Sequence, residues 1–431
     1  MTTKKAFWSN VLPSMAAFAF SGLYTIVDGF FIGQNIGDHG IAAVNIAYPI
    51  TALIQAIGTG IGMGGAIWVA ISLGESDNKK KNVYLGNTFV LLAAFSFFVT
   101  VFLMITYRPL LIFFGAKGII LEYAVDYLRV IVLGTIFQLC SVGFVPIIRN
   151  FGGAFVAMIA MIAGFVSNIL GDWLFTSVFQ MGTAGAALAT VLGQMIALLP
   201  CLIFIFKKKN LIRCAVFRPV YSSVYKISVT ALAPFGSIIS PMIVIVVMNK
   251  AALTYGGELE VACYAVISYV ISISNLLMQG IGDGVQPLLS RAYGSNEKVT
   301  LAKLKKQAYG LAILTGVICI CGFYASISSV PVMFGASYEV AQLYKKALPF
   351  FLIGLIFIPV VKVTICYLYA TDKVKLSYLL IYLEPITVAL FAGIILPAFW
   401  GLQGVWMAIP VTQFLLSVMS TGFLILERLK R

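Results

Sequence analysis

Long apolar segments constrain the fold of this chain more than any other feature of its sequence. A helix needs about 20 apolar residues to cross the hydrocarbon core of a bilayer, and runs of that length recur throughout the 431 residues. The alternating segments of about ten residues that mark a transmembrane β-barrel are absent. Twelve spans are predicted, at 11–33, 41–73, 83–107, 121–146, 153–178, 183–206, 229–253, 259–289, 304–327, 342–368, 375–398 and 402–425. The sequence therefore predicts an all-α integral membrane protein with twelve transmembrane helices.

The charged residues are few and unevenly placed. Only 10% of the residues are charged, whereas a soluble domain carries about 25%. The net charge of +14 could indicate nucleic-acid binding, but the spans explain it better. If the N-terminus is cytoplasmic, 22 of the 29 Lys and Arg residues fall on the cytoplasmic side, most densely at 79–81, 207–209 and 303–306. This bias follows the positive-inside rule, so we expect a multi-pass cell-membrane protein with both termini cytoplasmic and no nucleic-acid partner.

The second half of the chain repeats the first. Gly60-Ile-Gly-Met-Gly64 recurs 220 residues later as Gly280-Ile-Gly-Asp-Gly284, Phe114–Ala116 recurs at the same offset, and Gly182 recurs as Gly401. Each half holds an even number of spans, so both enter the membrane from the same side. We therefore predict two six-helix lobes related by a pseudo-two-fold axis along the membrane normal, as in transporters with parallel repeats. The predicted boundaries are 1–206 for the N-terminal lobe, 207–228 for a basic cytoplasmic linker and 229–431 for the C-terminal lobe.

Four oxygen-bearing side chains lie at matched depth in the first half. Asn168 and Asp172 are four residues apart and share a helix face, and their distance from the span end places them level with Asp28 and Thr190. At 1.5 Å per residue, all four lie about 7–15 Å below the outer surface. Carboxylate, amide and hydroxyl oxygens suit a small hard cation, and a desolvated aspartate can instead hold a proton. We predict a cation or proton-coupling site here. The alternative is a set of interhelical hydrogen bonds with neutral aspartates.

The second half lacks the matching acid, because Asn249 occupies the position that corresponds to Asp28. Two other acids lie inside its spans. Asp283 and Glu384 fall toward the predicted cytoplasmic side and are candidates for a substrate or proton site. A solvated helix end is the competing interpretation for Asp283.

Several motifs favour structural interpretations. A formal G-x-G-x-x-G within Gly58–Gly65 lies inside a membrane span, where it indicates close helix packing and not a dinucleotide site. Glu122, Asp126 and Arg129 share one helix face, which predicts an ion pair or, alternatively, an outer gate. The seven cysteines have no metal-ligand spacing and the only histidine is His39, so we expect no cofactor and no metal other than a coupling Na⁺. Without a nucleophile–base or H-E-x-x-H pattern, the chain is not expected to be an enzyme.

The residues resemble the multidrug and toxic compound extrusion (MATE) transporters along essentially the whole chain. The matching features are Asp28 in D-G-F-F-I-G on the first span, the G-x-x-x-Q-P-L-L run Gly282–Leu289, and the glycines Gly74 and Gly294. The set formed by Asn168, Asp172 and Thr190 resembles the DinF-like branch.

This resemblance implies two six-helix lobes and exchange of organic, often cationic, compounds for Na⁺ or H⁺ by alternating access. It implies a coupling role for Asp28, Asn168, Asp172 and Thr190, and a less certain one for Asp283. The NorM-type branch uses an acid in span 10, which is absent here, so its second-lobe cation site is not carried over. We expect a monomer that handles amphiphilic or cationic drugs. The alternative is a flippase for lipid-linked oligosaccharides or cell-wall precursors, a class of related fold.

Overall fold

The chain folds entirely into helices in the part that the structure describes. The computed structural model describes residues 2–208 and 210–429, and within them the side chains outside 23–26, 29–30, 38, 210 and 428–429. Lys209, Lys430 and Arg431, three of the predicted cytoplasmic charges, lie outside the described residues. The helices are α1 Thr3–Ile36, α2 Asp38–Gly74, α3 Asn78–Phe113, α4 Gly118–Leu133, α5 Thr135–Asn150, α6 Ala154–Asp172, η1 Trp173–Val178, α7 Gly182–Lys207, α8 Asn210–Cys214, α9 Tyr221–Gly256, α10 Glu258–Gly294, α11 Lys298–Ala325, α12 Ser329–Met333, α13 Tyr338–Ala370, α14 Val374–Leu390, η2 Phe391–Ile395 and α15 Leu396–Leu429.

The long helices account for the predicted spans. Among the described residues, nine helical stretches are long and apolar enough to cross a membrane, and the bent pair α4–α5 is a tenth. That number leaves out α1 and counts Val374–Glu427 once, although Gly401, with φ 52° and ψ −132°, divides this stretch into two helices. The predicted break between 398 and 402 therefore lies where the backbone leaves the helical conformation. The all-α class predicted from the sequence is confirmed.

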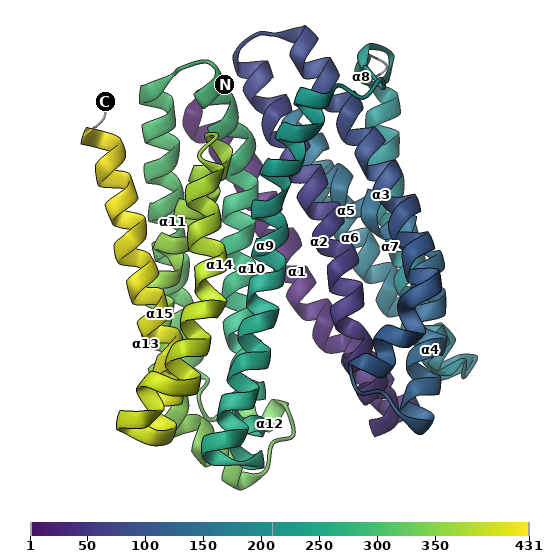
Figure 1. The fold of residues 1–431 in the computed structure, drawn as a ribbon, viewed down its shortest axis with the longest axis vertical. Coiled ribbons are helices and arrows are strands. Elements are labelled where there is room, and N and C mark those ends of the chain that lie inside the picture. Colours follow the sequence, from purple (N-terminus) through teal and green to yellow (C-terminus); the bar gives the residue numbers. More distant parts are fainter. Residues whose placement is uncertain (1, 209, 430–431) are drawn as a thin grey trace. The chain divides into compact units, whose positions relative to one another are not determined.

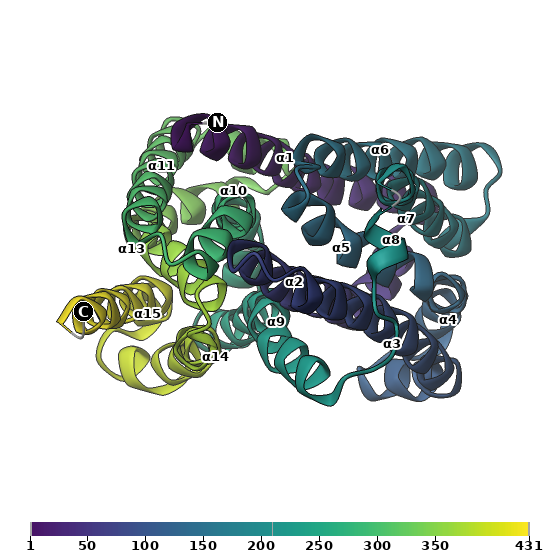
Figure 2. The ribbon, with the colours of Figure 1, turned by 90° about the horizontal axis from the view of Figure 1, so that it is seen from above.

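Two compact units divide the chain. One comprises residues 1–235 with 290–298, and the other comprises 236–289 with 299–431. Within each unit the long helices run side by side (Figure 1). In the first unit α6 packs along α7, and α1 packs against both; in the second, α13 packs against α14 and α15 (Figure 2). The lobe and linker boundaries drawn from the sequence remain a prediction.

The backbone carries the internal repeat. Residues with positive φ recur at offsets of 219 or 220, most of them at the turns that end helices. The pairs are Gly37 and Gly257, Ser76 and Asn296, Gly115 and Gly335, Gly152 and Asp372, and Gly182 and Gly401. Both repeats also contain a π-helical segment, η1 in the first and η2 in the second. Since left-handed positions are rare for residues other than glycine, their recurrence supports a repeated fold more strongly than short sequence matches do.

The fourth predicted span, 121–146, consists of two helices joined at a bend. The chain bends by 57° between α4 and α5 at Gly134, whereas the corresponding α13 continues through Gly354. A Cβ at Gly134 would overlap the side chain of Val191 on α7. The span predicted over 121–146 is therefore present as α4 and α5, with a break at Gly134 where the chain packs closely on α7.

The glycine-rich stretch of α2 packs against three helices, as its interpretation as a packing motif predicted. A Cβ at Gly60 would lie 2.9 Å from the carbonyl oxygen of Ala231 on α9. A Cβ at Gly62 would overlap the backbone of Gly143 on α5, and one at Gly65 would overlap Thr88 on α3. Backbones that approach this closely leave no room for a side chain. The packing interpretation of this motif is confirmed.

Replacing Gly62 with alanine should destabilise the first unit. The new methyl group would force α2 and α5 apart, and overpacking of this kind costs about 1–3 kcal/mol. Gly310→Ala on α11 is the matched control, because a Cβ there meets nothing within 4 Å. Thermal unfolding of the purified protein in detergent should show a lower midpoint for Gly62→Ala and an unchanged or slightly higher one for Gly310→Ala. Equal midpoints would contradict the packing described here.

Candidate functional site

Close packing of α6 on α7 sets the geometry of the predicted coupling site. A Cβ at Gly193 on α7 would lie 2.7 Å from the carbonyl oxygen of Gly164 and 3.0 Å from Cβ of Asn168. One at Gly171 on α6 would lie 2.9 Å from Cβ of Ala189. These small residues let the two backbones approach, and they bring the polar face of α6 against Thr190.

The carboxyl groups of Asp28 on α1 and Asp172 on α6 meet. The two side chains lie close enough for their charges to interact. Asp172 is fully buried, and its Oδ1 atom has no hydrogen-bond partner. Two ionised carboxylates at this separation repel each other, and a proton or a cation placed between them would relieve that repulsion.

Asn168 and Thr190 extend this pair into a larger group of oxygens. Asn168 is 3% exposed, and its side chain lies 3.2 Å from the hydroxyl of Thr190. With the amide turned about its axis, its nitrogen donates to Asp172 Oδ2 at 3.2 Å, while its oxygen accepts from the backbone N–H of Thr190 at 3.0 Å. The turned orientation satisfies both ends of the amide, so it is the better assignment. All four residues predicted for the coupling site thus lie together.

Tyr127 on α4 belongs to the same group, and the sequence gave no reason to select it. It is 6% exposed, and it lies close enough to Thr190, Asp28 and Asp172 to interact with their polar groups. Twenty tyrosines occur in the chain, and none has a spacing that would single it out. Only the bend between α4 and α5 could have drawn attention to this helix.

A second contact ties α1 to the end of α6. The hydroxyl of Thr176 in η1 donates to the backbone carbonyl of Asp172 at 2.6 Å, and Asn35 on α1 donates to that hydroxyl at 3.3 Å. The π-helical turn therefore begins directly after the buried Asp172, and α1 contacts this turn through Asn35. Single π-helical turns frequently occur at functional sites.

The chemistry of this group suits a proton or a small hard cation. It offers carboxyl, amide and hydroxyl oxygens, and no Lys or Arg forms an ion pair with it among the described side chains. The buried and unpartnered Oδ1 of Asp172 is the acceptor that such an ion would use. No cluster of three or more His, Cys, Asp or Glu side chains forms a metal site within the described ranges.

The two acids predicted in the second half are buried at separate places. Asp283 on α10 is 5% exposed and accepts from Gln279 Nε2 at 2.7 Å, so it is not a solvated helix end. Glu384 on α14 is 8% exposed and accepts from Ser240 and Gln413. Whether either residue acts on a substrate or a proton remains a prediction.

The face shared by Glu122, Asp126 and Arg129 on α4 holds no ion pair among the described side chains. The predicted ion pair was wrong. Their spacing places them on one side of the helix, but long side chains at a surface gain little from pairing and need not do so.

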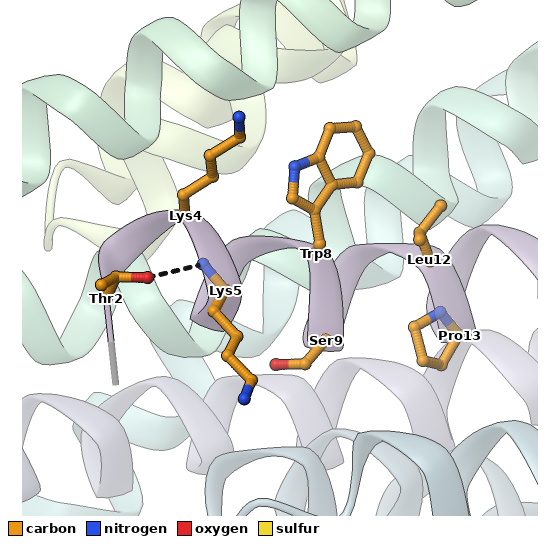
Figure 3. Close-up of a pocket in the computed structure, with 7 residues that line it drawn as sticks. All are labelled: Thr2, Lys4, Lys5, Trp8, Ser9, Leu12 and Pro13. Carbon is orange, nitrogen blue, oxygen red and sulfur yellow. Dashed lines mark hydrogen bonds between the residues drawn. The ribbon is translucent and has the colours of Figure 1, made fainter.

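A hollow of about 620 Å³ lies along the first turns of α1 and not at the acidic group. Figure 3 shows Lys4, Trp8 and Leu12 projecting from one side of this helix, with Lys5 and Ser9 on another. Its lining residues are Thr2, Lys4, Lys5, Trp8, Ser9, Leu12 and Pro13. Lysine and tryptophan are the residues expected where a helix meets the membrane surface, so this hollow is not the coupling site.

Comparison with known proteins identifies the family to which this fold and sequence are similar. Residues 13–174 and 231–386 match the family model described as MatE, and these two stretches begin 218 residues apart, close to the offset of the repeat. The multidrug export protein MepA of Staphylococcus saprophyticus is 25% identical over 317 residues, which are 72% of this chain and 68% of that protein. MepA of Staphylococcus aureus strain MRSA252 is 24% identical over 321 residues, 73% of this chain and 69% of that protein.

Solved structures agree with the fold. A MOP superfamily transporter from Pyrococcus furiosus superposes with a TM-score of 0.93 at 23% identity, covering 100% of this chain and 97% of that one. A multidrug resistance MATE family transporter in an outward-facing conformation gives 0.91 at 22% identity, with the same coverage. The predicted fold of twelve helices in two lobes is confirmed, and the DinF-like branch remains a prediction. Because the family model covers well over half of the chain, in both of its repeats, the protein belongs to the MatE (MATE) family of membrane transporters, and not to a class of enzymes.

Proposed function

We propose that this protein exports small organic compounds, many of them cationic, in exchange for H⁺ or Na⁺ by alternating access. One observation carries the proposal: the carboxyl groups of Asp28 and Asp172 lie close together inside a helical unit, and no cationic side chain within the described ranges is paired with them. A buried pair of this kind is stable only with an added positive charge. The relatives named as multidrug export proteins support the substrate class.

The added charge is a proton or Na⁺. When both carboxyl groups are ionised, they repel each other in a medium that screens poorly, so the pair captures a cation. A proton shared between the two oxygens meets this need. Na⁺ would do so by drawing on the same carboxyl oxygens together with the amide oxygen of Asn168 and the hydroxyl of Thr190.

Occupancy of the site controls how α1 packs. Asp28 reaches Asp172 from α1, so loss of the ion leaves repulsion between α1 and α6. An ion can shift a conformational equilibrium only by its difference in affinity for the two states. A site that joins two helices supplies such a difference, because any movement of α1 away from α6 takes it apart.

The distribution of charge also bears on the location and orientation of the protein. We propose that it works in the cell membrane as a monomer, with both termini in the cytoplasm. The excess of Lys and Arg in the segments assigned to that side supports this orientation.

Neutralising Asp28 should abolish coupled transport. Asp28→Asn keeps the size and hydrogen-bonding capacity of the side chain but can no longer gain or lose a charge. In proteoliposomes loaded with a fluorescent organic cation, an imposed pH or Na⁺ gradient should drive transport by the native protein and not by the variant. Glu258→Gln, at an exposed carboxylate in the first turn of α10, is the matched control and should transport normally. Full transport by Asp28→Asn would remove the basis of the proposal.

The two gradients, imposed one at a time, identify the ion. Transport driven by a pH gradient without Na⁺ identifies the proton, and transport driven by a Na⁺ gradient at equal pH identifies Na⁺. If neither gradient drives transport by the native protein, coupled exchange is excluded.

Removing the hydroxyl of Tyr127 should weaken ion binding without abolishing transport. Tyr127→Phe takes away a hydroxyl group beside Thr190, Asp28 and Asp172, and losing one polar contact of this kind costs about 0.5–1.5 kcal/mol. The ion concentration at half-maximal transport should therefore rise by roughly 2- to 10-fold at unchanged maximal rate. Tyr344→Phe is the control, because the buried hydroxyl of Tyr344 has no hydrogen-bond partner. A similar change in both variants would mean that Tyr127 acts only through packing.

A further inference from the structure

The second unit contains a buried carboxylate without a charged partner. Glu384 on α14 accepts from the amide nitrogen of Gln413 on α15 at 2.6 Å and from the hydroxyl of Ser240 on α9 at 3.2 Å. Both donors are neutral. Glu427, in the same unit, is instead paired with Lys373 at 2.6 Å. Among the described side chains, therefore, no charged group balances an ionised carboxylate at Glu384, and burying a charge without such a partner is unfavourable.

A buried acceptor next to Glu384 is unsatisfied. Gln413 is 3% exposed, and its Oε1 atom has no hydrogen-bond partner, although its nitrogen serves Glu384. If Glu384 binds a proton, turning the amide lets the new O–H group donate to this oxygen. The site can thus satisfy the ionised carboxylate through Gln413 Nε2 and the protonated acid through Gln413 Oε1.

The ionisable groups on the neighbouring helices do not form ion pairs with Glu384 among the described side chains. Lys250 follows Ser240 by ten residues and Lys375 precedes Glu384 by nine, so each lies about 14 Å away along its helix. Glu427 is held by Lys373 and Tyr367. Among the described side chains, the ionisable groups on these helices are Tyr221, Tyr225, Lys226, Lys250 and Tyr255 on α9, Tyr338, Glu339, Tyr344, Lys345, Lys346, Lys362, Cys366, Tyr367 and Tyr369 on α13, Lys375, Tyr378 and Tyr382 on α14, and Glu427 on α15.

The repeat shows that this acid is specific to the second half. The turns before α6 and α14 match at an offset of 220, Gly152 with Asp372, and at that offset Glu384 corresponds to Gly164 and Asp172 to Ala392. Neither acid therefore has an acidic counterpart in the other half. After the turns at Gly182 and Gly401 the offset is 219. Gln413 corresponds to Gln194, whose oxygen accepts from Ser141 at 2.5 Å, whereas the oxygen of Gln413 is unpartnered.

From these contacts we propose that Glu384, with Gln413 and Ser240, forms a proton-binding site in the second half of the transporter, separate from the Asp28–Asp172 site. The oxygens present are two from the carboxylate, one from the amide and one hydroxyl. Hard metal cations in proteins take about six or more oxygens, so this set suits a proton better. Uptake converts the carboxylate to the acid, with the proton coming from water at the predicted cytoplasmic side.

Infrared difference spectra of the full-length protein in lipid nanodiscs, recorded between high and low pH without Na⁺, test the proposal. Other carboxylates of the chain also gain a proton at low pH, so the spectra of Asp28→Asn/Asp172→Asn are compared with those of the same variant carrying Glu384→Gln. Glu384→Gln should remove one carboxylic-acid C=O component that shifts in D₂O and leave the rest of the acid band in place. The first-site substitutions make the outcome independent of the proposed coupling function, which the transport assays test.

Two further variants keep the result unambiguous. Gln413→Leu removes the acceptor, so the acid band should move to higher frequency, a change that a purely structural role for Gln413 would not produce. Glu427→Gln is the control and should leave this component unaltered, because Glu427 is paired with Lys373 and lies outside the proposed site. An acid band that Glu384→Gln leaves unchanged, or a Glu384 component that Na⁺ suppresses at constant pH, would overturn the proposal.

Discussion

A carboxyl group buried in a membrane protein must be neutralised by what lies beside it, and this constraint organises the polar interior of the transporter. Three acids meet it in three ways. Glu427 is paired with a lysine, Asp172 meets a second carboxyl group, and Glu384 is held by neutral donors. Only the first arrangement is complete without an added ion. The other two leave a charge to be supplied from outside, which is the property that an ion-driven transporter needs.

The precision of the first site comes from residues that carry no charge. Gly164, Gly171 and Gly193 let α6 and α7 approach until their backbones nearly touch, so the distance between Asn168 and Thr190 is set by backbone contact. A site fixed in this way changes little when side chains change rotamer. It can change when a whole helix moves, and α1, which contributes only Asp28 to the group of four, is the helix whose movement takes the site apart.

The sequence located the acids well because helical rise converts residue counts into depth. Asp28, Asn168, Asp172 and Thr190 were matched by counting from span ends, and they lie together. Their partner Tyr127 could not be found in this way, because its helix ends at a break that Gly134 makes against Val191. Spacing also misled: Glu122, Asp126 and Arg129 share a face without pairing, since a common face does not decide whether exposed side chains prefer each other or solvent.

The two halves of the chain share their backbone conformation but not their acidic residues. Turns with positive φ and the π-helical segments recur in both halves, so the backbone has been kept. The acids do not recur: Asn249 stands where Asp28 would be, and neither Asp172 nor Glu384 has an acid at the matching position. Two identical halves would bind an ion with equal affinity, and their contributions would change together. Halves with different acids can differ in affinity for an ion, and the proposed exchange needs such a difference because binding favours one conformation only through a difference in affinity.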